Sequence, residues 1–232
     1  MRMRKKKHSD ERIEACSEFL IREPLDLYSD PTAPFGKNAP LLLELGCGKG
    51  DFANGLSRKY PDHVIIALER VPDVAMMALE KAAATADERP DNLRFIIGHA
   101  QYLPDWFPPH SIERIYVNFC DPWPKKGYFK RRLTAPSFLQ TYRSLLVPGG
   151  ELHFKTDNEP LFDWSLEQFE AEGLETVFVT RDLHNSEMAQ SNIITEYERH
   201  FSSMGMNIFS AHVRFPETTS DSSAKLPEDD NE

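Results

Sequence analysis

The sequence lacks the cysteine patterns and long apolar runs that define several large classes of protein. Its three cysteines, Cys16, Cys47 and Cys120, have neither the even count of a disulfide framework nor the spacing of a zinc site. No apolar run approaches the roughly 20 residues that span a bilayer, and no apolar stretch or cleavage site follows the basic first residues. We therefore expect a cytoplasmic protein that involves neither a membrane nor a metal.

The charge balance argues at first against a nucleic-acid partner. With 27 basic and 37 acidic residues the formal net charge is −10, whereas binding to phosphates depends on Lys and Arg. The charge is unevenly placed, however. The stretch 216–232 holds six acidic residues and one lysine and is too polar to build a core, so we expect an acidic, disordered tail there. Basic residues cluster instead at 2–7 and 125–132.

Apolar runs alternate with amphipathic stretches from Leu41 onward, which predicts a parallel sheet covered by helices on both faces. We expect one Rossmann-like α/β domain over 31–215, preceded by a basic N-terminal arm and helix over 1–30. The seven predicted strands are 41–45, 64–68, 93–97, 112–118, 150–156, 174–180 and 207–214. The predicted helices are 10–21, 50–59, 73–85, 136–146, 159–171 and 195–203. The 26-residue connection 181–206 is longer than a plain loop, so part of it is expected to be functional.

A glycine-rich turn follows the first predicted strand. In ELGCGKG, Gly46, Gly48 and Gly50 lead directly into a helix, at the strand end where doubly wound folds bind nucleotides. Glu44 precedes the turn. Glu69 ends the next strand about 20 residues later, where a carboxylate can accept hydrogen bonds from both hydroxyls of a ribose. These features indicate a cofactor of the adenosine type.

The spacing of the glycines favours S-adenosylmethionine over a dinucleotide. NAD-binding turns read G-x-G-x-x-G, with a pyrophosphate at the helix N-terminus, and this turn reads G-x-G-x-G. A carboxylate at position 44 would repel a pyrophosphate but suits a ligand that carries an ammonium and a sulfonium. A glycine turn without a ligand stays open as an alternative. We assign no chemical role to Cys47 or Lys49, since such residues usually fill space or face solvent.

The fourth predicted strand runs into the string FCDPWPKKGYFKRRL. Asp121 stands at the carboxyl end of that strand between proline-stiffened neighbours, so its carboxylate should be held at the active edge. Trp123 and five basic residues follow, a combination of aromatic and cationic side chains that suits a base and its phosphates. Ordinary packing of the tryptophan and a solvated basic surface remain the alternative. The five basic residues are Lys125, Lys126, Lys130, Arg131 and Arg132.

Six strings in series resemble the bacterial tRNA (guanine-N7-)-methyltransferases, which modify guanine 46 in the variable loop of tRNA. The strings are ELGCGKG at 44–50, NFCDPWPKK at 118–126, KRRL at 130–133, HFKTDN at 153–158, DLHNS at 182–186 and ITEYE at 194–198. The resemblance implies a class I methyltransferase fold and S-adenosylmethionine as cofactor. It implies cofactor contacts from Glu44, Gly46, Gly48, Glu69, His99 and Asp121, and guanosine contacts from Lys125, Asp157, Thr195, Glu196, Tyr197 and Glu198. It also implies that the basic residues from Lys126 to Arg132 face RNA, and that Asp121 is the catalytic residue.

The chain departs from that family at two places. The family usually has Asp or Asn after the third strand to contact adenine, whereas this chain has His99, which can donate or accept only according to its tautomer. The family often has His or Arg at the positions of Gly127, Tyr128 and Phe129, so RNA contact here should depend more on stacking.

The expected reaction needs no general base, because N7 of guanine carries a free lone pair and no proton. Asp121 is therefore expected to orient the guanine and to favour its developing positive charge, with Asp157 and Glu198 as further acceptors. Three alternatives remain open: a methyltransferase for a small molecule or a protein, an RNA-binding protein without catalysis, and an NAD oxidoreductase, for which no hydride-transfer acid is evident. Monomer and homodimer are equally open.

Overall fold

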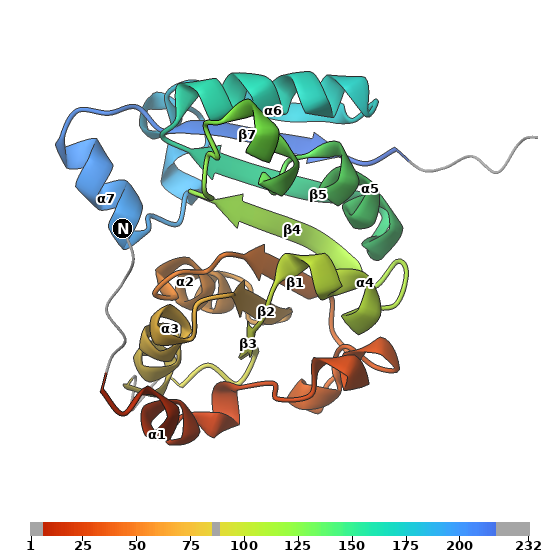
Figure 1. Ribbon diagram of the computed structural model, residues 1–232, viewed down its shortest axis with the longest axis vertical. Helices are drawn as coiled ribbons and strands as arrows, with labels where there is room; N and C mark the ends of the chain where they lie inside the picture. The colour runs from red at the N-terminus through yellow and green to blue at the C-terminus, as the bar shows by residue number, and fades with distance from the viewer. Residues whose placement is uncertain (1–6, 85–88, 217–232) are drawn as a thin grey trace, which may run out of the picture.

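Seven strands pair into one sheet within residues 7–84 and 89–216, the part of the chain that the computed structural model describes (Figure 1). The strand order is β3-β2-β1-β4-β5-β7-β6, and only β7 runs antiparallel to its neighbours β5 and β6. The strands are β1 (Leu41–Leu45), β2 (Val64–Glu69), β3 (Leu93–Ile97), β4 (Ile112–Asn118), β5 (Leu146–Thr156), β6 (Glu175–Thr180) and β7 (Phe209–Arg214). The prediction of a seven-stranded, mostly parallel sheet is confirmed. The arm at 1–6 and the predicted acidic tail from residue 217 lie outside the described residues.

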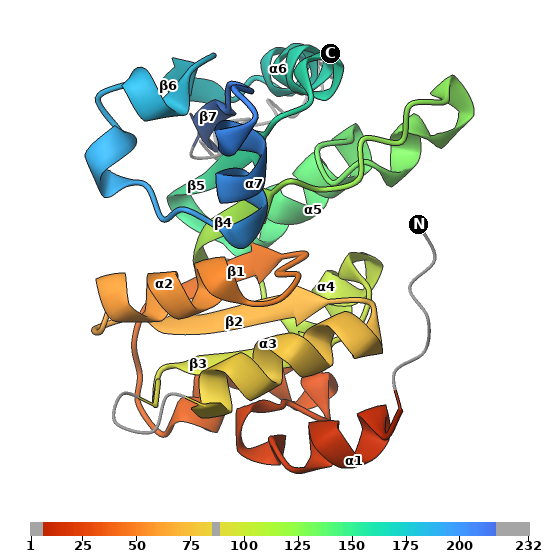
Figure 2. The ribbon, with the colours of Figure 1, turned by 90° about the vertical axis from the view of Figure 1, so that its left-hand side faces the viewer.

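Helices cover both faces of the sheet, as Figures 1 and 2 show. Apolar residues of α1, α2 and α3 pack on one face with Leu42 and Ile65, and those of α4, α5 and α6 pack on the other with Leu41 and Leu43. Neighbouring residues of a strand point to opposite faces, so a central strand such as β1 must be apolar on both. The helices are α1 (Ser9–Glu14), α2 (Asp51–Lys59), α3 (Pro72–Ala84), α4 (Leu103–Trp106), α5 (Pro136–Leu145), α6 (Glu159–Ala171) and α7 (Glu196–Ser203).

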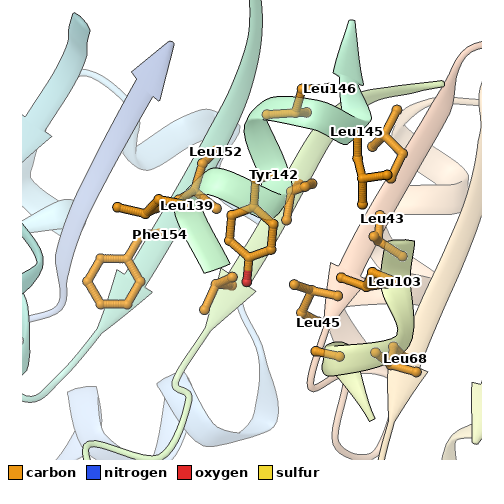
Figure 3. Close-up of a cluster of buried hydrophobic side chains, with 14 of the residues drawn as sticks. Leu43, Leu45, Leu68, Leu103, Leu139, Tyr142, Leu145, Leu146, Leu152 and Phe154 are labelled. Atoms are coloured by element: carbon orange, nitrogen blue, oxygen red, sulfur yellow. The ribbon is translucent and has the colours of Figure 1, made fainter. Parts of the chain in front are cut away.

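Tyr142 connects the core to the segment that follows the predicted basic loop. Its ring is fully buried in the cluster that contains Leu139, Leu152 and Phe154 (Figure 3). Its hydroxyl donates a hydrogen bond of 2.9 Å to the backbone oxygen of Leu133. A buried phenol needs such a partner, and this one fixes the point at which the loop 119–133 returns to the core.

The predicted helix 10–21 is too long. Helix α1 ends at Glu14, and a 3₁₀ turn at Ser17–Phe19 leads into an extended stretch. There the amide of Ile21 donates to the oxygen of Phe95, and Leu20 forms a parallel bridge with Phe95. The segment therefore covers the exposed edge of β3, a long-range pairing that overrides the local helical pattern.

Two further elements differ from the sequence-based expectation. Strand β5 begins at Leu146, four residues before the predicted start, because Leu146 pairs with Ile112 and the VPGG stretch is accommodated as a bulge opposite Glu113. The four-residue helix α4 was not predicted. None of the helices in the described ranges has the length and apolar character needed to cross a membrane.

The long connection 181–206 lies beside α2 and ends in α7 (Figure 2). It contains two 3₁₀ turns, Leu183–Asn185 and Ala189–Ser191. Lys59 of α2 donates to the backbone oxygen of Ser191 at 2.5 Å, and Ile193 packs against the core cluster of the α2 face. The connection thereby brings the string ITEYE to the helix that follows the glycine turn.

Candidate active site

The glycine turn after β1 leaves open space where side chains would normally lie. Gly46, Gly48 and Gly50 all have positive φ, at 79°, 55° and 80°, a conformation that favours glycine. A Cβ placed on Gly46 or Gly48 would meet no atom within 4 Å, whereas one on Gly50 would lie 2.8 Å from the Cβ of Ala78. The first two glycines thus border free space, and the third allows α2 and α3 to approach closely.

Glu69 is held rigidly at the end of β2. One carboxylate oxygen accepts from the amide of Gly48 at 3.1 Å, and the other accepts from the amide of Val71 at 2.9 Å. Each carboxylate oxygen has two lone pairs, so both retain capacity for a hydroxyl donor. The side chain is only half-buried. This geometry suits a ribose diol bound beside the glycine turn.

Glu44 is a buried carboxylate with an unused oxygen. The residue is 2% exposed, its Oε1 accepts from Asn118 at 3.4 Å, and its Oε2 has no hydrogen-bond partner. Burial raises the pKa of Glu44 to about 8, although the Asn118 bond and the positive charge of Lys155 oppose the rise. An unsatisfied buried carboxylate beside open glycines fits a cationic ligand such as S-adenosylmethionine, and Glu44, Gly46, Gly48 and Glu69 would hold it.

Binding of S-adenosylmethionine should therefore release a proton from Glu44. Since the cation favours the ionised carboxylate, affinity should rise roughly tenfold per pH unit up to about pH 8 and then level off. Calorimetry from pH 6 to 9, in two buffers with different ionisation enthalpies, measures both the affinity and the proton release. The same series on Glu44→Gln isolates the titration of the ligand's own amine. A wild-type profile that matches the Glu44→Gln profile would contradict the assignment.

The same group links pH to folding in the cofactor-free protein. The pKa of Glu44 in the folded state, about 8, lies above its ordinary value of 4.5. The stability contributed by the protonated form is therefore present in acid and is lost as the pH rises from about 4.5 to 8.

His99 follows β3 and is exposed. Its Nδ1 accepts from the amide of Gln101 at 3.2 Å. In a neutral ring the hydrogen must then reside on Nε2, a tautomer assigned from this bond. His99 therefore offers no second acceptor for an adenine amine, and its Nε2–H instead suits a ring nitrogen.

Asp121 lies at the same edge of the sheet as the glycine turn. Its carboxylate is 2.9 Å from the guanidinium of Arg70, which follows β2, and β1 lies between β2 and β4 in the sheet. The flanking residues Phe119 and Trp123 both have positive φ, at 51° and 42°. Such a conformation is costly for large side chains and concentrates at functional sites. The expectation that the turn and this carboxylate meet at one edge is confirmed.

The loop after Asp121 carries an exposed cluster of cations and rings. Lys125, Lys126, Lys130 and Arg131 are exposed, and the Arg131 guanidinium lies 5.0 Å from the Trp123 ring centre and 4.7 Å from that of Tyr128. Nucleic acids are bound by cations beside stacking surfaces of this kind.

Arg132 does not belong to this exposed cluster, contrary to the prediction that it faces RNA. It is 4% exposed, packs between the rings of Phe129 and Trp164, and donates to the backbone oxygen of Pro122 at 2.8 Å. Its Nε and Nη2 hold the loop from inside by donating to the backbone oxygens of Pro122 and Trp123, while its Nη1 has no hydrogen-bond partner.

The string TEYE forms the start of α7, and Thr195 caps it. The Thr195 hydroxyl accepts from the amide of Glu198, and the Glu198 carboxylate accepts from the amide of Thr195, which is a capping box. Glu196 pairs with Lys49 of the glycine turn at 2.8 Å, and its amide donates to Asp51. The predicted substrate segment is thus bonded directly to the predicted cofactor segment.

Glu198 is fully buried and its oxygens are occupied by protein donors. Lys155 donates to one oxygen at 2.6 Å, while His184 and Asn192 donate to the other at 2.7 and 2.5 Å. Burial alone would raise the pKa of Glu198, but the Lys155 charge and these hydrogen bonds outweigh it and the pKa lies below its usual value. A guanine N–H could reach Glu198 only by displacing one of these donors.

Asp157 and Tyr197 lie near Asp121. Partial burial raises the pKa of Tyr197, and so do the charges of Asp157 and Asp121. The Tyr197 ring is 45% exposed and contacts Phe119, with ring centres 4.8 Å apart. Burial also raises the pKa of Asp157. The Tyr197 ring is therefore packed on the residue that lies two positions before Asp121, and the charges of Asp121 and Asp157 both act on it.

Several residues of the site were not singled out from the sequence. Arg70 directly follows Glu69, and Lys155 lies inside the string HFKTDN, so position along the chain could have indicated both. Nothing local indicates that Asn118, His184 and Asn192 converge on Glu44 and Glu198. Burial raises the pKa of the Cys47 thiol well above its ordinary value, which agrees with leaving it without a chemical role.

Several solved structures that share this fold are methyltransferases. The 16S rRNA methyltransferase KamB superposes with a TM-score of 0.61 over 82% of this chain and 94% of that one, at 16% identity. A 16S rRNA (adenine(1408)-N(1))-methyltransferase of Catenulisporales acidiphilia, solved with S-adenosylmethionine, gives a TM-score of 0.53 over 94% and 96%, at 13% identity. These likenesses show that the chain has the fold of class I S-adenosylmethionine-dependent methyltransferases.

Sequence comparison narrows the class. The family model described as putative methyltransferase matches residues 38–211. A tRNA (guanine-N(7)-)-methyltransferase of Brevibacillus brevis is 46% identical over 190 residues, 82% of this chain and 87% of the relative. One of Bacillus subtilis is 39% identical over 215 residues, 93% and 99% of the two chains. The chain belongs to the tRNA (guanine-N7-)-methyltransferase family.

Proposed function

We propose that this protein transfers the methyl group of S-adenosylmethionine to N7 of a guanine in tRNA, at position 46 of the variable loop. The observation that carries the proposal is the position of the Asp121 carboxylate at the edge that bears the glycine turn, with Tyr197 packed on the nearby Phe119. The family of relatives supports the substrate.

The reaction is mainly a problem of placement. The cofactor supplies an electrophilic methyl group on a sulfonium. With the cofactor bound, the N7 lone pair would form the new N–C bond as the S–C bond breaks, and the positive charge would pass to the guanine ring. No proton moves, so the protein needs no general base. Holding the two reacting atoms in line can supply roughly 7 to 11 kcal/mol.

The protein's own residues divide this work. Glu44 and Glu69 orient the cofactor, with His99 at the adenine. Asp121 orients the guanine and stabilises its developing charge, and Asp157 offers a second acceptor to the guanine edge. Lys125, with Thr195, Glu196 and Tyr197 from the start of α7, contacts the guanosine in this proposal. Glu198 acts through the segment it anchors.

RNA binding should be strongly salt-dependent. The exposed cations are Lys125, Lys126, Lys130 and Arg131. If each contacts a phosphate, affinity for tRNA should fall roughly 100-fold between about 50 and 200 mM salt. Filter binding over this range tests the prediction, and the affinity for S-adenosylmethionine serves as a control that should change little. Salt-independent methylation of a small molecule, with no transfer to tRNA, would refute the proposal.

A further inference from the structure

Arg70 and Asp121 form an ion pair across the cofactor turn. Arg70 immediately follows the ribose-binding position Glu69, and its Nη2 lies 2.9 Å from Oδ2 of Asp121. Their strands, β2 and β4, lie on either side of β1. The two side chains therefore meet above the end of β1, where the glycine turn begins. Neither the sequence pattern nor the family strings had indicated Arg70.

The pair is too exposed to serve mainly as a support for the fold. The side chains are 49% and 62% exposed, and ion pairs in such surroundings contribute little to stability. Within the described part of the chain, no second carboxylate pairs with Arg70. Substrate can therefore exchange these partners at little cost.

A guanosine nucleotide presents the two groups that this pair could accept. The N1–H and N2 amine of guanine are donors that suit the Asp121 carboxylate, and a phosphate is an acceptor that suits a guanidinium. Separation of Arg70 from Asp121 also changes the electrostatic effect of the Asp121 carboxylate on the guanine. A guanidinium 2.9 Å away would offset the negative charge of Asp121 just where positive charge develops on the ring.

We propose that the target nucleotide opens the Arg70–Asp121 pair: guanine takes the Asp121 carboxylate, and a phosphate of the target nucleotide or its neighbour takes Arg70. Arg70 is then an RNA-binding residue outside the basic loop. When Arg70 moves to the phosphate, its guanidinium no longer offsets the negative charge of Asp121 during methyl transfer. This inference rests on the proposed function.

The test compares Arg70→Ala, Arg70→Lys and Arg89→Ala. Arg89 is the matched control, an arginine of 53% exposure that pairs with Glu18 at 2.8 Å on the amino side of β3. Steady-state methylation of tRNA is measured at several salt concentrations, with calorimetry for S-adenosylmethionine. Arg70→Ala should raise KM for tRNA about tenfold. It should also make the slope of log(1/KM) against log salt concentration shallower by about 0.7 to 0.9. Arg70→Lys should restore most of the slope, and Arg89→Ala should behave as wild type.

Other outcomes overturn the inference. If Arg70→Ala lowers kcat but leaves the salt slope unchanged, Arg70 merely supports Asp121. If the substitution weakens the binding of S-adenosylmethionine more than threefold, Arg70 belongs to the cofactor site. Both results leave the proposed function standing, because wild-type protein would still methylate tRNA. Absence of methyl transfer by the wild type would instead refute the proposed function itself.

Discussion

Replacement of Asp121 by alanine is expected to lower the turnover number for methyl transfer to tRNA by roughly 100- to 1,000-fold at saturating cofactor. Methyl transfer places a positive charge on guanine, and this carboxylate lies at the edge where the ring would sit. The backbone has positive φ at Phe119 and Trp123, on either side of Asp121, and this turned conformation places the carboxylate at that edge. A preorganised charge of this kind stabilises the transition state more than the ground state.

Asp121→Asn separates charge from hydrogen bonding. Asparagine keeps an oxygen acceptor but loses the charge, so we expect a smaller loss, roughly 10- to 100-fold. Steady-state turnover numbers at saturating tRNA and S-adenosylmethionine measure both variants. Glu18→Ala is the control, because Glu18 is an exposed carboxylate paired with an arginine at a different edge of the sheet. Near-wild-type rates in both Asp121 variants would remove this residue from the mechanism.

The largest effect on stability is expected at Lys155. Lys155→Met should lower the free energy of unfolding by roughly 3 to 5 kcal/mol, because it leaves Glu198 buried without its counter-ion. Lys155 is itself 4% exposed and also donates to Asn192 and to the backbone oxygen of Ile193. These bonds therefore connect β5 to the 181–206 connection, both at Asn192 and Ile193 and at Glu198 in α7.

Urea denaturation measures the change, and a matched variant shows whether burial is the cause. Lys49→Met removes an ion pair of similar length, 2.8 Å to Glu196, whose side chains are 45% and 55% exposed. It should cost less than about 1 kcal/mol. The double variant Lys155→Met with Glu198→Gln should recover part of the loss, since the buried charge is then gone. Equal effects of Lys155→Met and Lys49→Met would contradict this explanation.

The sheet was predictable because its signals are local. Strands β1, β3 and β4 begin and end where the apolar runs do, and the glycine turn was recognised from seven letters. The second half of the predicted helix 10–21 failed because Ile21 bonds to the edge of β3, a partner more than 70 residues away. No local pattern encodes such a pairing.

The sequence motifs predicted which segments form the site, but they predicted only part of the roles of the individual residues. A cationic loop sequence indicates RNA contact, yet Arg132 differs from its neighbour Arg131 only through Phe129 and Trp164, which enclose it. The same holds for Glu198, because the donors that occupy its carboxylate oxygens, Lys155 and His184, come from other elements of the fold. Burial is a property of the folded chain, so these two residues could not be separated from exposed ones in advance.

The most direct measurement is nucleoside mass spectrometry of bulk tRNA after incubation with the wild-type protein and isotopically labelled S-adenosylmethionine. The label should appear in 7-methylguanosine, and fragment mapping should place it at position 46 of the variable loop. A tRNA that carries adenine there should remain unlabelled. Label in any other nucleoside, or none in tRNA that still binds the protein, would contradict methyl transfer to guanine N7.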